Sequence, residues 1–242
     1  EPRDFPLAQA TGESIGTPAL VAMLKMVHAQ HGRLPWAKLF EPAIKLAEDG
    51  FVVGPRLSKS FSDNKATLES DPEARSIYLD AAGKPWPQGH LLKNPAYGKT
   101  LRAIASEGPK ALTRGAIADA IVAAAQRQPR AGTLTVSDLQ AYQPRRLDPL
   151  CGAYRVYQVC TMPSPSSANA MLSILSLYER ARPHSDGPST PKAPTVEDWA
   201  AFVWASRLSY VDRDHYMADD RFIEAVTAVH GGYHGIERGV VG

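Results

Sequence analysis

The sequence has few cysteines and no long apolar run. Only two of the 242 residues are cysteine, Cys151 and Cys160. No segment approaches the roughly 20 apolar residues of a membrane-spanning helix. The 27 lysines and arginines nearly balance the 25 aspartates and glutamates, and the two signs are interspersed. Without a basic stripe, the sequence gives little support for binding nucleic acid or an anionic membrane.

Several sequence motifs that would identify a chemistry are also missing. There is no Walker loop, no dinucleotide-binding fingerprint and no paired-carboxylate site. The first residues, 1–4, are charged, and neither a signal pattern nor an initiator methionine opens the chain. We therefore expect an internal fragment or a processed product.

The two cysteines lie in a stretch, 149–179, that has strand character and then helix character. If its strands turn at Arg155 and Val156, Cys151 faces Cys160 in a non-hydrogen-bonded pair, where side chains lie closest. A disulfide is then geometrically possible. Val156 argues against it, because a primed hairpin turn needs positive φ. The usual burial of free cysteine favours two buried thiols, with the disulfide as the alternative.

Other elements are predicted from caps, proline entries and apolar spacing. Prolines at 163 and 165 end the strand pair, and Ser166 or Ser167 is expected to cap the following helix. Residues 135–138 have the pattern of a capping box and open a short helix, and residues 195–198 open the last long helix. Further helices are predicted at 18–32, 42–50, 57–68, 95–108 and 111–127, a strand at 76–79 and a turn at 82–83.

The predicted helices should bury apolar faces. The inward residues are expected to be Leu20, Val21, Leu24 and Val27 in the first helix, and Trp199, Phe202, Val203 and Leu208 in the last. Asp212, Arg213 and Asp214 are expected to face outward. Helices dominate, strands number about four, and no closed sheet is visible, so the fold class is α+β and mainly helical.

Residues 12–16, Gly-Glu-Ser-Ile-Gly, match the pattern of a nucleophile elbow centred on Ser14. That motif needs a strand feeding the serine and a helix leaving it. The preceding residues are not a convincing strand, and Pro18 follows closely. A plain glycine loop is therefore the favoured interpretation, with a serine hydrolase as the alternative.

The histidines do not form a convincing site. His230 and His234 have the spacing of helical zinc ligands, but Gly231 and Gly232 lie between them and no cysteine is near, so a flexible tail is favoured. Residues 212–215, Asp-Arg-Asp-His, point in different directions on a helix. The remaining histidines stand alone: His28, His31, His90 and His184. No metal or cofactor is predicted.

Taken together, segments in order along the chain resemble the large-subunit portion of the γ-glutamyltransferase family, among the N-terminal-nucleophile hydrolases. The resemblance runs from Gly16 to Phe222. Residues 162–167, Met-Pro-Ser-Pro-Ser-Ser, resemble the family's MPPPSS segment, whereas Ala168, Asn169 and Val156 replace its usual glycines. The other matching segments are 16–18, 32–36, 42–43, 46–51, 94, 101, 104–105, 108–109, 115, 134–135, 138–139, 141–142, 152–155, 212–213, 216 and 220.

The resemblance implies a partial αββα sandwich and an enzyme that cleaves γ-glutamyl amides. In that family a precursor cuts itself before a threonine, which becomes the N-terminal nucleophile of a small subunit and uses its own α-amine as base. The acyl group then passes to water or to an amino acid. No residue here matches that threonine, and Arg3 does not match the family's substrate-gripping arginine convincingly. The resemblance therefore assigns no catalytic residue to this chain.

The resemblance also sets expectations for partners, location and organisation. The partners would be a small-subunit polypeptide and a small γ-glutamyl substrate, and the location periplasmic or extracellular. Residues 1–222 would form the large-subunit segment and 223–242 an atypical glycine-rich tail. Alone, the chain should leave apolar helix faces uncovered, be inactive, and be poorly soluble or oligomeric. A related amide acylase, or an inactive binding scaffold, is the alternative.

Overall fold

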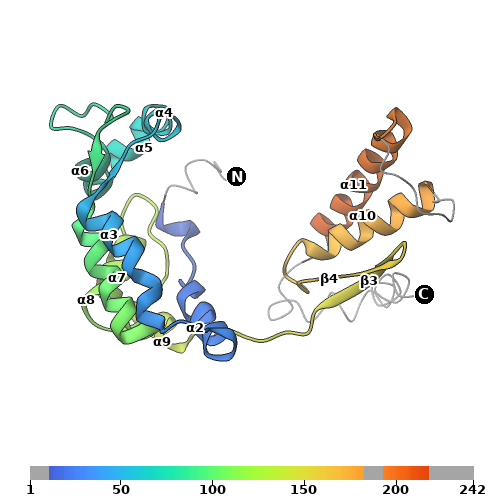
Figure 1. The fold of residues 1–242 in the computed structure, drawn as a ribbon, viewed down its shortest axis with the longest axis horizontal. Coiled ribbons are helices and arrows are strands. Elements are labelled where there is room, and N and C mark those ends of the chain that lie inside the picture. The colour runs from blue at the N-terminus through green and yellow to red at the C-terminus, as the bar shows by residue number, and fades with distance from the viewer. Residues whose placement is uncertain (1–10, 183–192, 218–242) are drawn as a thin grey trace. The chain divides into compact units, whose positions relative to one another are not determined.

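The computed structural model describes residues 11–182 and 193–217 (Figure 1). The chain divides into two compact units, residues 1–145 and 146–242. Each unit is described by itself.

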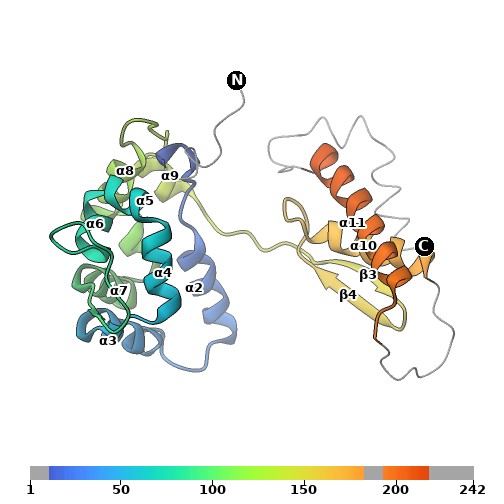
Figure 2. The same cartoon turned by 90° about the horizontal axis from the view of Figure 1, so that it is seen from above.

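The first unit is helical (Figure 2). Its α-helices are α2 (Leu20–His31), α3 (Glu41–Asp49), α4 (Pro55–Asp63), α5 (Lys65–Ser70), α6 (Pro72–Tyr78), α7 (Pro95–Glu107), α8 (Gly115–Ala125) and α9 (Val136–Ala141). Three 3₁₀ turns accompany them: η1 (Gly12–Ser14), η2 (Trp36–Phe40) and η3 (Gly108–Leu112). The strands β1 (Phe51–Val52) and β2 (Leu91–Leu92) form an antiparallel pair.

The local signals place most of these helix ends. Asn94 caps α7, because its side chain accepts a hydrogen bond from the backbone N–H of Tyr97 at 2.9 Å. Thr135 and Asp138 form the predicted capping box of α9. Gly50 ends α3 with a φ of 94°, a conformation that favours glycine.

The interior of this unit consists of small separate clusters. In the first, Ile44 and Ala47 of α3 pack against Leu101 of α7. The second joins α8 to the region around α9, through Ala118, Ala125, Leu134 and Leu139. The third gathers around the short sheet, with Val53, Phe61 and Leu92 buried. Three modest clusters bury less apolar surface than one continuous core would.

The predicted strand at 76–79 is wrong, because these residues largely belong to helix α6. The side chain of Asp71 accepts a hydrogen bond from the N–H of Ala74 at 2.8 Å, and Pro72 occupies the first turn, which together start a helix. Only Leu79 makes a bridge, to Pro85. The turn at 82–83 is confirmed, with Gly83 at a φ of 76°. The helix predicted at 57–68 is instead two helices, which meet at Asn64.

Helix α2 does not bury the face predicted for it. The helix ends before Gly32 as predicted, but it begins at Leu20 rather than at Pro18, and none of its residues is buried. Leu20 is 65% exposed, Leu24 45% and Val27 44%. The apolar spacing predicted the helix correctly, and the structure leaves that face uncovered.

The second unit joins a hairpin to two helices. Strands β3 (Leu150–Tyr154) and β4 (Tyr157–Thr161) pair antiparallel, and the helices are α10 (Ala168–Ala181) and α11 (Val196–Tyr216). Helix α10 contacts both the hairpin and α11 (Figure 2). The turn is at Arg155 and Val156 as predicted, and its positive φ, 53°, falls on Arg155. Val156 adopts no positive φ, so the objection to this turn does not apply.

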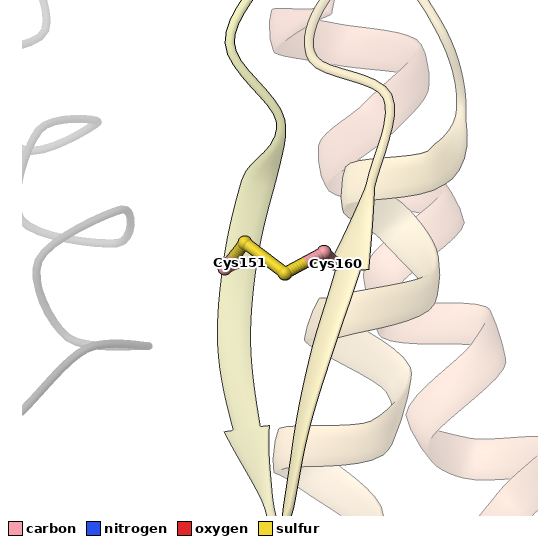
Figure 3. The surroundings of a disulfide bond; sticks show 2 residues. All are labelled: Cys151 and Cys160. Atoms are coloured by element: carbon pink, nitrogen blue, oxygen red, sulfur yellow. A yellow bond between two sulfur atoms is a disulfide. The ribbon is translucent and has the colours of Figure 1, made fainter. Parts of the chain in front are cut away.

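The cysteines form a disulfide, so the favoured prediction of two buried thiols is wrong. Cys151 and Cys160 are direct partners in the β3–β4 ladder, with their Cα atoms 4.1 Å apart (Figure 3). The hairpin register places them together, as the alternative required. Cys160 is exposed, contrary to the expected burial. In the chain-entropy account, closing so short a loop stabilises the folded state by about 3 kcal/mol.

Helix α11 begins where it was predicted, after Thr195, which forms a capping box with Asp198, but its buried face is different. Its buried residues are Ala205 and Ser209. Trp199 is 59% exposed and Leu208 55%, and Phe202 and Val203 are exposed as well. The two residues that α11 buries are therefore small ones rather than the large apolar ones.

The α+β, mainly helical class is confirmed for the described residues, whose four named strands form two separate two-stranded sheets. The αββα sandwich stays a prediction. Within the described ranges, we find no helix long and apolar enough to span a bilayer. The predicted tail, 223–242, lies outside the described residues.

Acid should destabilise the protein through its capping aspartates. Hydrogen bonds from the Ala74 N–H and from Arg127 lower the pKa of Asp71. Those from Thr135 lower the pKa of Asp138, and those from Thr195 and Arg182 lower that of Asp198. A carboxylate with a lowered folded-state pKa contributes stability above its unfolded pKa, and that contribution is lost as the pH falls through the folded value. We expect the melting temperature to drop as the pH falls below about 4.

The Asp71→Asn variant is the matched control, because asparagine also caps helices but does not titrate. Its melting temperature should fall less than that of the wild type between pH 6 and pH 3. Equal falls would show that Asp71 does not contribute to the acid response.

Candidate functional site

Ser14 is not presented as a nucleophile in the structure. It ends the 3₁₀ turn η1, and its Oγ donates a hydrogen bond to the carbonyl of Thr11 at 3.1 Å. The next helix begins only at Leu20, after an extended segment. A nucleophile elbow requires the helix to leave directly from the serine. The glycine-loop interpretation is therefore the one that the geometry supports.

The glycine of this turn has a packing reason instead. Gly12 is buried, and a Cβ atom added to it would lie 1.7 Å from the carbonyl oxygen of Ala125, at the end of α8. Gly132 is equally close-packed, since a Cβ there would lie 2.2 Å from the carbonyl oxygen of Gly12. Only glycine permits this approach of three backbone segments.

The described histidines have structural contacts. A ring nitrogen of His28, Nε2, lies 2.8 Å from the carbonyl oxygen of Leu34, and the ring meets Trp36 edge-on. His90 stacks on Trp86 at 3.8 Å between ring centroids. His31 lies in the last turn of α2. His184, His230, His234 and Arg3 lie outside the described residues.

No metal centre is found in the part of the chain that the structure describes. Within it, no three histidine, cysteine, aspartate or glutamate side chains gather closely enough to hold an ion. The adjacent Asp214 and Arg213 form an ion pair with each other. Asp212 is exposed, as predicted for an outward residue.

A pocket of about 420 Å³ lies in the first unit. Its cations are Lys110 and Arg114, and its other polar groups are contributed by Thr113, Gln140, Tyr142 and Gln143. Lys110 follows the start of η3, and Arg114 precedes α8. The residues lining it include no histidine and no carboxylate. It could accept an anionic group, but it lacks the general base that acyl transfer requires.

The 162–167 segment, which carries the MPPPSS-like sequence, connects β4 to α10. Of the two serines predicted to cap α10, Ser167 makes no capping hydrogen bond with its side chain. Its Oγ instead accepts a hydrogen bond from the guanidinium Nε of Arg213 at 2.8 Å. Ser166 Oγ accepts a longer one, at 3.4 Å, from the N–H of Ala168. The prediction that Arg213 faces outward is therefore wrong: it holds the end of this segment against α11.

Arg213 belongs to a polar seam that runs along the α10–α11 contact. Ser209 Oγ donates to Ser173 Oγ at 3.0 Å, and Arg182 Nε donates to Asp198 at 2.8 Å. Arg213, near the end of α11, contacts Ser167 just before α10, and Arg182, just after α10, contacts Asp198 in the first turn of α11. The two helices therefore run antiparallel. Hydrogen bonds at fixed positions define the register of the two helices more narrowly than apolar contact does.

The seam was not predicted from the sequence, although a signal for it exists. Ala205, Ser209 and Arg213 recur every four residues along α11, which places them on one helix face. The larger apolar residues nearby drew the prediction to another face. Near the same contact, burial and the carboxylate of Asp198 raise the pKa of Tyr178.

The comparisons with known proteins identify the family. The sequence model described as "Gamma-glutamyltranspeptidase" matches residues 3–233. The chain belongs to the γ-glutamyltranspeptidase family. The resemblance of its segments to that family, from Gly16 onward, is thereby confirmed.

Curated relatives include hydrolases and acylases. The chain is 31% identical over 210 residues to a glutathione hydrolase proenzyme of Escherichia coli, covering 86% of this chain and 35% of that protein. It is 37% identical over 204 residues to the acylase ACY 1 proenzyme of a Pseudomonas species, covering 83% of this chain and 35% of that protein. The chain thus spans about a third of the length of these family members.

Among solved structures, the fold matches the γ-glutamyltranspeptidase of Helicobacter pylori. The TM-score is 0.78 at 26% identity, over 91% of this chain and 62% of that one. The transpeptidase CapD of Bacillus anthracis matches with a TM-score of 0.67 at 27% identity, over 87% of this chain and 72% of that one.

Replacing Gly12 tests its close packing. Gly12→Ala should lower the free energy of unfolding by about 1–3 kcal/mol, because the new methyl group meets backbone rather than a movable side chain. Gly16→Ala is the matched control in the same loop, since nothing lies within 4 Å of its added Cβ. Its effect should stay within about 0.5 kcal/mol in urea denaturation. Equal effects of the two substitutions would contradict the packing role.

Proposed function

We propose that this chain is the helical scaffold of a γ-glutamyl hydrolase and transferase, and that another polypeptide carries the nucleophilic threonine. The family match over residues 3–233 carries the proposal. The threonine would attack the γ-glutamyl amide, with its own α-amine as base, and form a γ-glutamyl ester. Water or an amino acid would then take the acyl group. No residue of this chain is assigned a catalytic role.

The uncovered apolar faces support a scaffold role. Several large apolar side chains are exposed on α11, on the sides of the helix that do not carry the buried Ala205 and Ser209: Val196, Trp199, Phe202, Val203, Trp204, Leu208 and Val211. We call these residues the α11 outer face. The exposed face of α2 adds Leu20, Leu24 and Val27. Apolar patches of this kind mark surfaces that another element covers, so we propose that the nucleophile-bearing polypeptide packs on the α11 outer face.

An amide acylase of the same family is the second candidate. The identity to the acylase ACY 1 proenzyme, 37%, is higher than that to the glutathione hydrolase proenzyme, 31%, over similar lengths. An inactive binding scaffold is the third candidate. A threonine nucleophile in the polypeptide that accompanies this chain would separate both enzymes from the scaffold, and turnover of different amides would separate the enzymes from each other.

We further propose a periplasmic or extracellular location for the chain. The disulfide between Cys151 and Cys160 supports it, because such bonds form and persist in oxidising compartments. Residues 1–222 would form the large-subunit segment and 223–242 a separate tail.

Activity should require the second polypeptide. The purified 242-residue chain should not release p-nitroaniline from γ-glutamyl-p-nitroanilide, whereas the same chain produced with the polypeptide encoded after it should. A β-lactam amide substrate, assayed in parallel, tests the acylase. Robust turnover by the chain alone would contradict the scaffold role.

The α11 outer face should govern association. Leu208→Glu should change the free energy of unfolding by less than about 0.5 kcal/mol, because the side chain is exposed. It should also reduce self-association of the chain in sedimentation velocity and weaken co-purification with the second polypeptide. Ala205→Glu is the matched control on the buried face: it should cost roughly 3 kcal/mol, because a charge enters the seam. Unchanged association of Leu208→Glu would argue against this docking surface.

A further inference from the structure

The outer face of the β3–β4 hairpin carries the disulfide. Side chains alternate along a strand, so Cys151, Ala153, Gln158 and Cys160 share one face. Gly152, on the opposite face, is buried, and both strands contact α10. Ala153 and Gln158, which neighbour the disulfide on its own face, are exposed. Figure 3 shows the bond lying across the two strands.

The two cysteines of the disulfide are not equally exposed to solvent. Cys160 is exposed, whereas Cys151 is half-buried. Thiol–disulfide exchange begins when a thiolate attacks one sulfur along the bond, and its rate depends on access to that sulfur. The sulfur of Cys160, the more exposed of the two residues, is therefore the expected point of attack.

We propose that the Cys151–Cys160 disulfide is a thiol-exchange site of the unassembled chain, modified at Cys160 by a small thiol such as reduced glutathione. The incoming thiolate forms a bond to the sulfur of Cys160, and the bond between the two protein sulfurs breaks. The electron pair of that bond leaves with Cys151 as a thiolate, which takes a proton from water. A second small thiol can then reduce the mixed disulfide, releasing its oxidised dimer and leaving two cysteine thiols.

The hairpin should make the first step reversible. The strand pairing begins with Leu150 opposite Thr161 and ends with Tyr154 opposite Tyr157. It holds the two cysteines opposite each other, with their Cα atoms 4.1 Å apart. The Cys151 thiolate can thus attack the mixed disulfide within the same molecule and expel the small thiol. The modification accumulates only while the small thiol is in excess. This site does not depend on the proposed hydrolase activity, because it needs only the exposed hairpin.

The test traps the mixed disulfide on the native full-length chain. The protein is incubated with excess reduced glutathione, quenched with acid, treated with N-ethylmaleimide and analysed by peptide mass spectrometry. We expect glutathione on Cys160 and N-ethylmaleimide on Cys151. An adduct on Cys151 in equal or greater amount would overturn the proposal. A disulfide that reacts only after guanidinium unfolds the chain would also overturn the proposal. The unfolded sample serves as the control that both adducts can be detected.

Single-cysteine variants give an independent measurement. In Cys151→Ser the remaining thiol is the exposed one, and in Cys160→Ser it is the half-buried one. Without denaturant, the first should react with Ellman's reagent roughly tenfold faster than the second. Equal or reversed rates in variants with native circular dichroism would overturn the proposal. If either variant fails to fold, the ratio of adducts on the wild-type chain decides.

Discussion

Helix α11 meets α10 through small and polar side chains, and this contact determines what the second unit can bury. Ser209 is hydrogen-bonded to Ser173, Ala205 is 3% exposed, and Arg213 reaches Ser167. Small residues let two helices approach closely, and the hydrogen bonds fix how they align. The larger residues of the same helix then necessarily point elsewhere, so the α11 outer face stays uncovered. An apolar face left open by the chain's own packing is the physical basis for treating this unit as part of an assembly.

The first unit also leaves apolar side chains uncovered. Its buried residues form three clusters rather than one core, and α2 buries none of its residues. Further contacts add to these clusters: the close backbone approach at Gly12, the capping residues Asn94 and Thr135, and the bidentate ion pair of Arg102 with Glu48. That pair is largely exposed, so it contributes little to stability.

Membership of the γ-glutamyltranspeptidase family gives these observations a common explanation. The relatives that match are about three times as long as the matched region, and surface that is open here can be interior in a longer assembly. The disulfide adds a feature that the family assignment does not require. It lies on the face of the hairpin that Ala153 and Gln158 share, and both of these residues are exposed.

The sequence by itself determined most of the helices, the starts of α7, α9 and α11, the hairpin register and the family. The first three are local properties, because a proline entry, a capping box and a two-residue turn act over a few residues. The family is recognised from the order of short matching segments along the chain, which requires no structure. The register alone placed Cys151 opposite Cys160, but the sequence could not decide whether they were bonded, because burial of cysteine is only a tendency.

Tertiary structure decided which faces are buried. Large apolar residues occur around most of the circumference of α11, and in the structure Trp199 and Leu208 lie exposed while Ala205 and Ser209 are buried. Which face of a helix is buried depends on the contacts that neighbouring elements make with it, and those elements are formed by residues far away in the sequence.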